Sequence, residues 1–281
     1  MLNHSIEDYP KISCLLVTAP GRFEFFKRSV KCYACQTYPN LELVVVNEGP
    51  KDYQKQIFEH LEKLGRSDTR TIFLDGFYTL GALRNISIAL SRGDLFVQWD
   101  DDDFCTPDRL MVQFSHLFKT NKKVCFLSDQ LHYYFPTKQL FWESWKDYSS
   151  GGGYKKYSLI PGTILAYKDF LYSRVRYPSA GSHASAGEDS VLTNALVDNF
   201  HDDVTLLGLQ GYKHVYSFHG SNVWDFSHHS ALGSCRSHYR DFILKYREKI
   251  SKTLDFLELA DTIQVMGRDG LAFIYSKKND Q

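Results

Sequence analysis

Short apolar runs alternate with amphipathic helical patterns over the first hundred residues of this chain. Four apolar runs predict buried strands, at residues 12–18, 41–46, 71–74 and 94–99. Three intervening stretches predict helices, at residues 23–36, 53–64 and 80–91. This β-α-β-α-β-α-β order favours a parallel sheet with helices on both faces. We therefore predict an α/β fold, Rossmann-like, with a mostly parallel central sheet.

The second half of the chain is less regular. We expect a strand at 124–128, a hairpin over 131–142, a strand at 163–167 and a short helix at 191–196. Residues 148–153 read SSGGG after Tyr148, which predicts a mobile loop over a binding site. Residues 237–260 carry an apolar stripe at helical spacing, which predicts a C-terminal amphipathic helix.

Charge and cysteine content narrow the functional classes. Lys plus Arg and Asp plus Glu both number 33, so nothing favours nucleic acid as a partner. The six cysteines are scattered, and the Cys32-x-x-Cys35 pair has no second pair to complete a zinc site. The N-terminus lacks an apolar run, and no segment is long enough to span a bilayer. We expect a cytoplasmic protein with reduced thiols, whose membrane contact, if any, is peripheral at the inner face.

Four consecutive aspartates, Asp100 to Asp103, follow the apolar strand at 94–99. In open α/β sheets ligands bind at the carboxyl ends of the strands. Carboxylate oxygens there suit Mg²⁺ or Mn²⁺, which takes its other ligands from phosphates and water. The alternative is a solvated acidic turn in which Asp103 or Asp108 caps the helix that begins near Pro107.

Residues 10–110 resemble the nucleotide-binding half of inverting family-two glycosyltransferases with the glycosyltransferase A-type fold. The resemblance is carried by four segments: ISCLLVTAPGRFEFFKRSV, CQTYPNLELVVVNEGP, LGALRNISIALSRGDLFVQWDDDD and FCTPDRL. It implies a nucleotide-diphosphate sugar, a UDP-sugar, as donor. It assigns donor binding to eight residues: Thr18, Ala19, Pro20, Arg22, Glu48, Arg84, Asp100 and Asp101. It makes Asp102 the first choice for direct metal contact, with Asp100 as the other member of the Asp-x-Asp pair. Glu48 stands where the family often has Asp.

The second half carries a weaker resemblance. The segment YSLIPGTILAY is similar to the Gly-Thr strand that lines the acceptor side in the family. GEDSVL resembles the Glu-Asp motif, which implies Asp189 as the general base with Glu188 beside it. The segment FHGSNVWDFSHH gathers polar residues, and a C-terminal histidine on the metal is a family habit, so His219 is the third metal candidate. A hydrogen-bonded loop histidine is the equal alternative.

The resemblance implies one domain in two halves. Residues 1–110 would bind the nucleotide sugar and 111–235 would bind the acceptor and catalyse, followed by a C-terminal amphipathic helix and tail at 236–281. The acceptor would be a glycan, a lipid-linked molecule or a protein, as in polysaccharide biosynthesis. Two other functions stay open: a nucleotidyltransferase of sugar-nucleotide synthesis, and a non-catalytic sugar-binding protein. The sequence makes no prediction of the oligomeric state.

Overall fold

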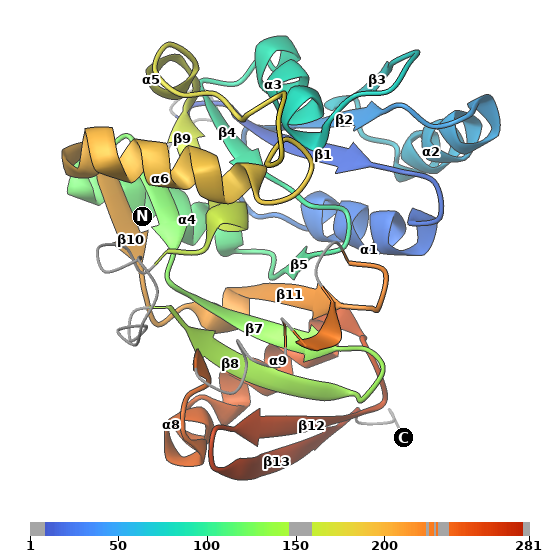
Figure 1. Ribbon diagram of the computed structural model, residues 1–281. Helices are drawn as coiled ribbons and strands as arrows, with labels where there is room; N and C mark the ends of the chain where they lie inside the picture. Colours follow the sequence, from blue (N-terminus) through green and yellow to red (C-terminus); the bar gives the residue numbers. More distant parts are fainter. Residues whose placement is uncertain (1–8, 146–158, 223–224, 228, 230–235, 278–281) are drawn as a thin grey trace. The chain divides into compact units, whose positions relative to one another are not determined.

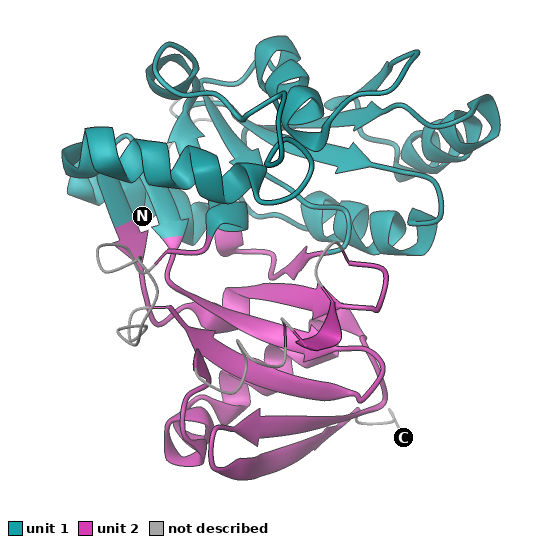
Figure 2. Cartoon of the chain, viewed as in Figure 1, with its two compact units in different colours: residues 1–102, 110–126, 161–205 teal, residues 103–109, 127–160, 206–281 magenta. Residues whose placement is uncertain are grey.

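The chain forms two compact units that interleave along the sequence. The computed structural model describes residues 9–145, 159–222, 225–227, 229 and 236–277. Figure 2 colours the units separately: one comprises residues 1–102, 110–126 and 161–205, and the other comprises residues 103–109, 127–160 and 206–281. These boundaries differ from the divisions expected after residues 110 and 235. The predicted loop at 148–153 lies outside the described residues.

The first unit is built on a seven-stranded sheet with the order β10-β6-β9-β4-β1-β2-β3 (Figure 1). Its strands are β1 (Ile12–Thr18), β2 (Leu41–Asn47), β3 (Thr69–Phe73), β4 (Leu95–Gln98), β6 (Val124–Leu127), β9 (Leu165–Tyr167) and β10 (Val204–Leu207). Strand β1 pairs in parallel with β2 and β4, and β2 pairs in parallel with β3. Strand β9 runs antiparallel to β4 and β6. The predicted α/β fold with a mostly parallel sheet is confirmed.

Helices cover this sheet, and α1 and α3 lie on opposite sides of it in Figure 1. The helices are α1 (Phe23–Ala34), α2 (Lys51–Leu64), α3 (Leu80–Leu90), α4 (Arg109–Thr120), α5 (Lys168–Tyr172) and α6 (Glu188–Phe200). Because both faces are covered, β1, β2 and β4 are apolar along most of their length, as expected for parallel strands. The first three helices lie where the helical spacing predicts them, within two residues at each end.

The second unit contains a six-stranded sheet with the order β13-β12-β8-β7-β11-β5. Its strands are β5 (Phe104–Cys105), β7 (Asp129–Tyr134), β8 (Gln139–Ser144), β11 (His214–Phe218), β12 (Thr262–Gly267) and β13 (Gly270–Ser276). Strands β7 and β8 form the antiparallel hairpin that the sequence predicts. This unit also contains the helices α8 (Arg240–Lys245) and α9 (Arg247–Leu257).

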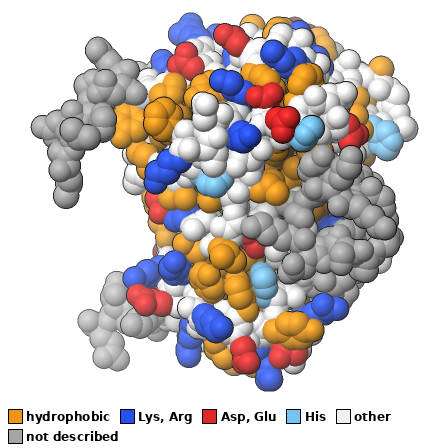
Figure 3. Space-filling model, turned by 90° about the vertical axis from the view of Figure 1, so that its left-hand side faces the viewer, with side chains coloured by type: hydrophobic (Ala, Val, Ile, Leu, Met, Phe, Trp, Pro, Cys, Tyr) orange, Lys and Arg blue, Asp and Glu red, His pale blue; other side chains and the backbone are white. Residues whose placement is uncertain are grey.

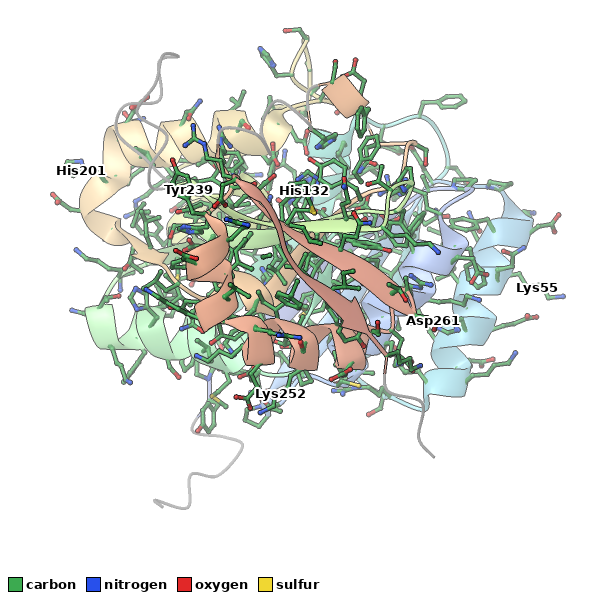
Figure 4. All side chains as sticks on the ribbon, turned by 90° about the horizontal axis from the view of Figure 1, so that it is seen from below. Lys55, His132, His201, Tyr239, Lys252 and Asp261 are labelled. Atoms are coloured by element: carbon green, nitrogen blue, oxygen red, sulfur yellow. The ribbon has the colours of Figure 1, made fainter. Side chains whose placement is uncertain are left out.

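A buried polar group fixes the register of that hairpin. The Nδ1 atom of His132 (labelled in Figure 4) lies 2.8 Å from Oε1 of Glu143, and Gln130 Nε2 donates to Glu143 Oε2 at 3.1 Å. Burial disfavours the charge on Glu143, but His132 and Gln130 hold its pKa below the ordinary value. If β8 shifted by one residue, these polar side chains would lose their hydrogen bonds to one another, which is costly for buried groups.

The C-terminal region differs from the expected helix and tail. The predicted helix at 237–260 is divided at Tyr246, whose φ of −106° and ψ of 8° end α8 and precede α9. The tail expected after it is the hairpin of β12 and β13. Burial alternates along β12, with Ile263 and Val265 inward and Gln264 outward, which is the period-two pattern of a strand in residues assigned to the tail.

Two shorter elements also differ from expectation. The strand expected at 163–167 begins at Leu165, because Pro161–Thr163 forms a 3₁₀ turn. The helix expected at 191–196 extends over the whole of α6.

Surface charge, cysteine burial and helix length can each be compared with the expectations from the composition. On the face drawn in Figure 3, basic and acidic side chains are interspersed. The thiol of Cys32 is buried and that of Cys35 is exposed. Among the described residues, no helix has both the length and the apolar character needed to cross a bilayer.

Helix α3 approaches the segment before α6 so closely that a side chain is excluded at Gly81. A Cβ there would lie 1.9 Å from the backbone oxygen of Pro178, and the Gly81 amide donates to Ala184 O at 2.8 Å. We expect Gly81→Ala to lower the free energy of unfolding by about 1–3 kcal/mol, the usual cost of overpacking. Urea denaturation measures it. A stabilisation, as glycine-to-alanine changes in exposed helices normally give, would contradict the close packing.

Candidate functional site

Asn47 joins the carboxyl ends of β1 and β2. Its Nδ2 donates to the backbone oxygen of Thr18 at 2.7 Å, and its Oδ1 accepts from the Gly49 amide at 2.9 Å. The Thr18 hydroxyl lies 2.8 Å from the Tyr53 hydroxyl. Thr18 is therefore buried and fixed, whereas Ala19 and Pro20, which follow it, are exposed. The expected contacts of these three residues with a nucleotide stay predictions.

Glu48 follows β2 and reaches toward the segment after β3. Its Oε2 accepts a hydrogen bond from the Tyr78 backbone amide at 2.8 Å. The contact connects two loops at the same end of the sheet. Its carboxylate is half-buried, so one oxygen is held while the side chain remains partly open to solvent.

The first three aspartates of the run, which follow β4 after Trp99, have different partners. Asp100 Oδ1 pairs with Arg84 at 2.9 Å, and Asp100 Oδ2 accepts from Gln98 Nε2 at 2.8 Å. Asp101 Oδ1 lies 2.8 Å from an Arg22 guanidinium nitrogen, and the same nitrogen contacts Asp102 Oδ2. Two arginines thus hold three carboxylates at the carboxyl end of β4.

These two arginines do not fully offset the cost of ionising every carboxyl group in the cluster. Burial and the neighbouring Asp102 raise the pKa of Asp101 to about 8, although Arg22 and the Thr18 hydroxyl oppose the rise. A further cation beside Asp101 and Asp102 would favour the ionised form of both. The cluster therefore has the electrostatic character of a cation site.

Arg84 connects this cluster to α6. It is 8% exposed, and its Nε atom pairs with Glu188 Oε1 at 2.9 Å while its other end holds Asp100. Burial disfavours its charge, but Asp100 and Glu188 raise its pKa, so it stays a cation. The sequence predicted Arg84 at the donor site, and the structure places it between the aspartates and the acidic start of α6.

Asp189 lies in the first turn of α6, next to Glu188. Burial and then the charge of Glu188 raise the pKa of Asp189 to about 6, while Arg84 opposes the rise. Its Oδ1 accepts from the Ser190 amide at 2.7 Å. A carboxylate with a pKa near neutrality can accept a proton at physiological pH, which is what a general base requires.

Gln98 and Tyr177 belong to this network without being among the residues predicted from the sequence, and Gly162 belongs to the Gly-Thr segment expected on the acceptor side. Gln98 orients Asp100 and accepts a hydrogen bond from the Tyr177 hydroxyl at 2.9 Å. A Cβ at Gly162 would lie 3.3 Å from Asp100 Oδ2, so glycine lets the 3₁₀ turn approach the carboxylate. Gln98 could have been noticed, because it is the one polar side chain of β4. Tyr177 has no local sequence signal.

The fourth aspartate belongs to the other unit. Asp103 Oδ1 accepts from the Ser217 amide at 3.3 Å, and its Oδ2 lies 3.5 Å from His214 Nε2. Burial, and then Arg109, lower the pKa of His214 well below its ordinary value, so the ring is neutral. Asp103 therefore anchors the chain to β11. Asp108, the other candidate helix cap, pairs with Lys213 and accepts from Thr106.

His219 also lies in the second unit, just after β11. Its Nδ1 atom is 2.8 Å from the Ser221 hydroxyl, and its backbone amide donates to Asn222 Oδ1 at 2.8 Å. These contacts are those of a hydrogen-bonded turn. A contact of His219 with a metal stays a prediction. Trp224 and His228, of the same segment, lie outside the described residues, and His229 packs against His132 and Phe218.

The protein groups alone do not make a complete metal site in the part of the chain that is described. There, no three side chains of the His, Cys, Asp or Glu type gather closely enough to hold an ion. A cation at Asp101 and Asp102 would need further ligands from a bound molecule or from water.

Several known proteins resemble this chain. An uncharacterized glycosyltransferase of Haemophilus influenzae is 29% identical over 118 residues, which are 41% of this chain and 35% of the relative. The putative colanic acid biosynthesis glycosyl transferase WcaA of Escherichia coli is 29% identical over 113 residues, covering 40% of this chain and 39% of WcaA. The chain therefore matches little more than a third of the length of either relative.

Solved structures share the fold. TarS of S. aureus, residues 1–349, superposes with a TM-score of 0.55 at 16% identity, covering 74% of this chain and 60% of that one. The same protein in complex with UDP-GlcNAc has a TM-score of 0.55 at 13% identity, covering 88% and 65%. Residues 14–172, more than half of the chain, match the model of Glycosyl transferase family 2, and they contain most of β1, all of β2 through β9, Arg84 and the aspartates. The chain is a member of Glycosyl transferase family 2.

Proposed function

We propose that this chain transfers a glycosyl group from a UDP-sugar to an acceptor hydroxyl, with inversion and with a divalent cation. The observation that carries the proposal is the array Asp102–Asp101–Arg22 and Asp100–Arg84–Glu188, with Asp189 beside it. It combines carboxylates that can bind a metal, an arginine, Arg22, that can reach a diphosphate, and a carboxylate of raised pKa. The TarS structures with UDP-GlcNAc and UDP, and the family, support a nucleotide-sugar donor.

Asp102 is the best placed of the aspartates to hold Mn²⁺ or Mg²⁺. Both oxygens of Asp100 are engaged, by Arg84 and Gln98, and Asp101 is more deeply buried. When bound, the ion would neutralise charge on the leaving diphosphate as a Lewis acid. Diphosphate oxygens would complete its coordination, which fits the lack of a full protein ligand set.

The remaining donor contacts belong to residues at the carboxyl ends of the strands. Arg22 is 29% exposed and can reach a phosphate, whereas Arg84 is buried and keeps Asp100 oriented. Thr18, Ala19, Pro20 and Glu48 would surround the nucleoside. Glu48, where the family often has Asp, has one carboxylate oxygen already held by Tyr78, which leaves the other for the nucleoside.

Asp189 would take the proton of the acceptor hydroxyl. Its raised pKa makes it a stronger base than an ordinary aspartate, and it is still mostly ionised at pH 7. A base that activates the acceptor for direct displacement of the diphosphate requires no covalent intermediate. Such a single displacement inverts the anomeric centre.

Product analysis tests the class of reaction. The protein is incubated with Mn²⁺ and a panel of nucleotide sugars, and released nucleotide and sugar are measured. Release of a nucleoside diphosphate supports glycosyl transfer. Pyrophosphate release would indicate the nucleotidyltransferase, and binding without any turnover of donor or acceptor would indicate the sugar-binding protein.

We expect Asp102→Ala to abolish transfer and metal-dependent UDP binding while the protein stays folded. The substitution removes the carboxylate proposed to contact the ion. Calorimetry with UDP and Mn²⁺ measures binding, and Asp198→Ala on the exposed side of α6 is the matched control. Undiminished binding in Asp102→Ala would remove the metal from this position.

Asp189→Asn is expected to keep donor binding and to lower kcat by about a hundredfold or more, the usual loss for a missing general base. Asp198→Asn, nine positions later on α6, should behave as the wild type. Turnover near wild type with the true acceptor would rule Asp189 out as the base.

The pH dependence follows from the same carboxylate. Because Asp189 acts in its ionised form, kcat/KM for the acceptor should fall as the pH drops below about 6. Glu188 raises this pKa by like-charge repulsion, so Glu188→Gln should shift the acid limb to lower pH. An acid limb that stays at the same pH in Glu188→Gln would contradict the assignment of the limb to Asp189.

A further inference from the structure

Arg22 occupies the position where a cation would bind the aspartates. It lies at the turn after β1, one residue before α1, next to Gly21, whose φ is +87°. A single guanidinium nitrogen contacts Asp101 Oδ1 and Asp102 Oδ2 together. The two carboxylates are 4% and 13% exposed, so this ion pair is largely shielded from water.

The guanidinium and a divalent ion cannot both use these carboxylates. An ion at Asp102 needs the lone pairs toward which Arg22 now donates, and two cations at this distance repel each other strongly in a buried site. Arg84 cannot replace Arg22 as the partner of Asp101 and Asp102, because Arg84 is already paired with Asp100 and Glu188. Metal entry therefore requires Arg22 to leave.

A diphosphate offers the Arg22 guanidinium an alternative anionic partner. The arginine fork matches phosphate oxygens in geometry and charge, and the side chain is exposed enough to turn. A nucleoside diphosphate also adds negative charge, which reduces the repulsion between the Arg22 guanidinium and the divalent ion. Donor and ion should then bind with positive cooperativity.

We propose that Arg22 is the resident counter-ion of Asp101 and Asp102 and couples metal binding to donor binding. The divalent cation gains these carboxylates when a nucleoside diphosphate takes the guanidinium. This proposal rests on the proposed donor. It adds that the empty site excludes free metal and that one side chain is responsible.

The test compares Mn²⁺ affinity without nucleotide in three proteins. Arg22→Met keeps the length of the side chain and removes the charge. Lys27→Met removes a cation from α1, the helix that follows Arg22, where Lys27 pairs with Glu24, and is the matched control. Isothermal titration calorimetry measures Mn²⁺ binding with and without saturating UDP.

In the wild type and in Lys27→Met, UDP should strengthen Mn²⁺ binding by about tenfold or more, within the usual range of coupling between sites. Arg22→Met should bind Mn²⁺ about tenfold more tightly than the wild type in the absence of nucleotide, and UDP should add less. An unchanged or weaker nucleotide-free Mn²⁺ affinity in Arg22→Met, with normal Mn²⁺-dependent UDP binding by the wild type, overturns the inference alone. Absence of UDP binding by the wild type overturns the proposed donor as well.

A second measurement uses the wild type, in case Arg22→Met does not fold. The Nε–H signal of Arg22 is identified in a ¹⁵N-arginine spectrum by its loss in Arg22→Lys. Mg²⁺ alone should leave the signal in place, whereas Mg²⁺ with UDP should shift it as the guanidinium changes partner. A signal at the same position in the empty and the fully loaded protein contradicts the proposal.

Discussion

The ion pairs of the buried Arg84 connect the two acidic groups of the site. Its guanidinium lies between Asp100, after β4, and Glu188, at the start of α6. Removing a cation from such a position leaves buried carboxylates facing each other, which costs several kcal/mol in general. The position of α6 against the sheet, and with it the position of Asp189, therefore depends on one side chain that belongs to neither element. Arg84 comes from α3, whose close approach to the segment before α6 requires Gly81.

The two ends of the same sheet use buried acids differently. At the amino end, Glu42 accepts hydrogen bonds from the Ser13 hydroxyl at 2.6 Å and the Arg92 amide at 2.5 Å, and these donors belong to neighbouring strands and turns. That carboxylate is part of the scaffold. At the carboxyl end, burial and the neighbouring Asp102 raise the pKa of Asp101 to about 8, and Arg22 and Thr18 offset this rise only in part. A carboxyl group with so perturbed a pKa is typical of a ligand-binding or catalytic site.

The sequence predicts the first unit well because its signals are local. Continuous apolar runs between helical stretches define β1, β2 and β4, and their polar ends mark the functional edge of the sheet. The partners of the site residues are not local signals: Tyr177 reaches Gln98 across 79 positions, and Arg84 reaches Glu188 across 104. Nothing near Arg22 in the sequence indicates that it faces Asp101. The C-terminal hairpin is a different case: the residues after 260 are assigned to a tail, although β12 alternates buried and exposed side chains and pairs with β13.

Electrostatic coupling extends from the aspartates to the candidate base. Asp100 raises the pKa of Asp189 and Arg84 lowers it, so the basicity of Asp189 depends on the charge of the donor site. A diphosphate alone would add negative charge and hold the proton on Asp189, whereas a divalent cation alone would make Asp189 a weaker base. When donor and ion are bound together, their charges nearly cancel. The pKa of Asp189 then stays close to its value without either ligand. If Arg22 lets the donor and the cation bind only together, Asp189 keeps a pKa suited to neutral pH when both are bound. The movement of Arg22 from the aspartates to the diphosphate would then both admit the metal and preserve the basicity of Asp189.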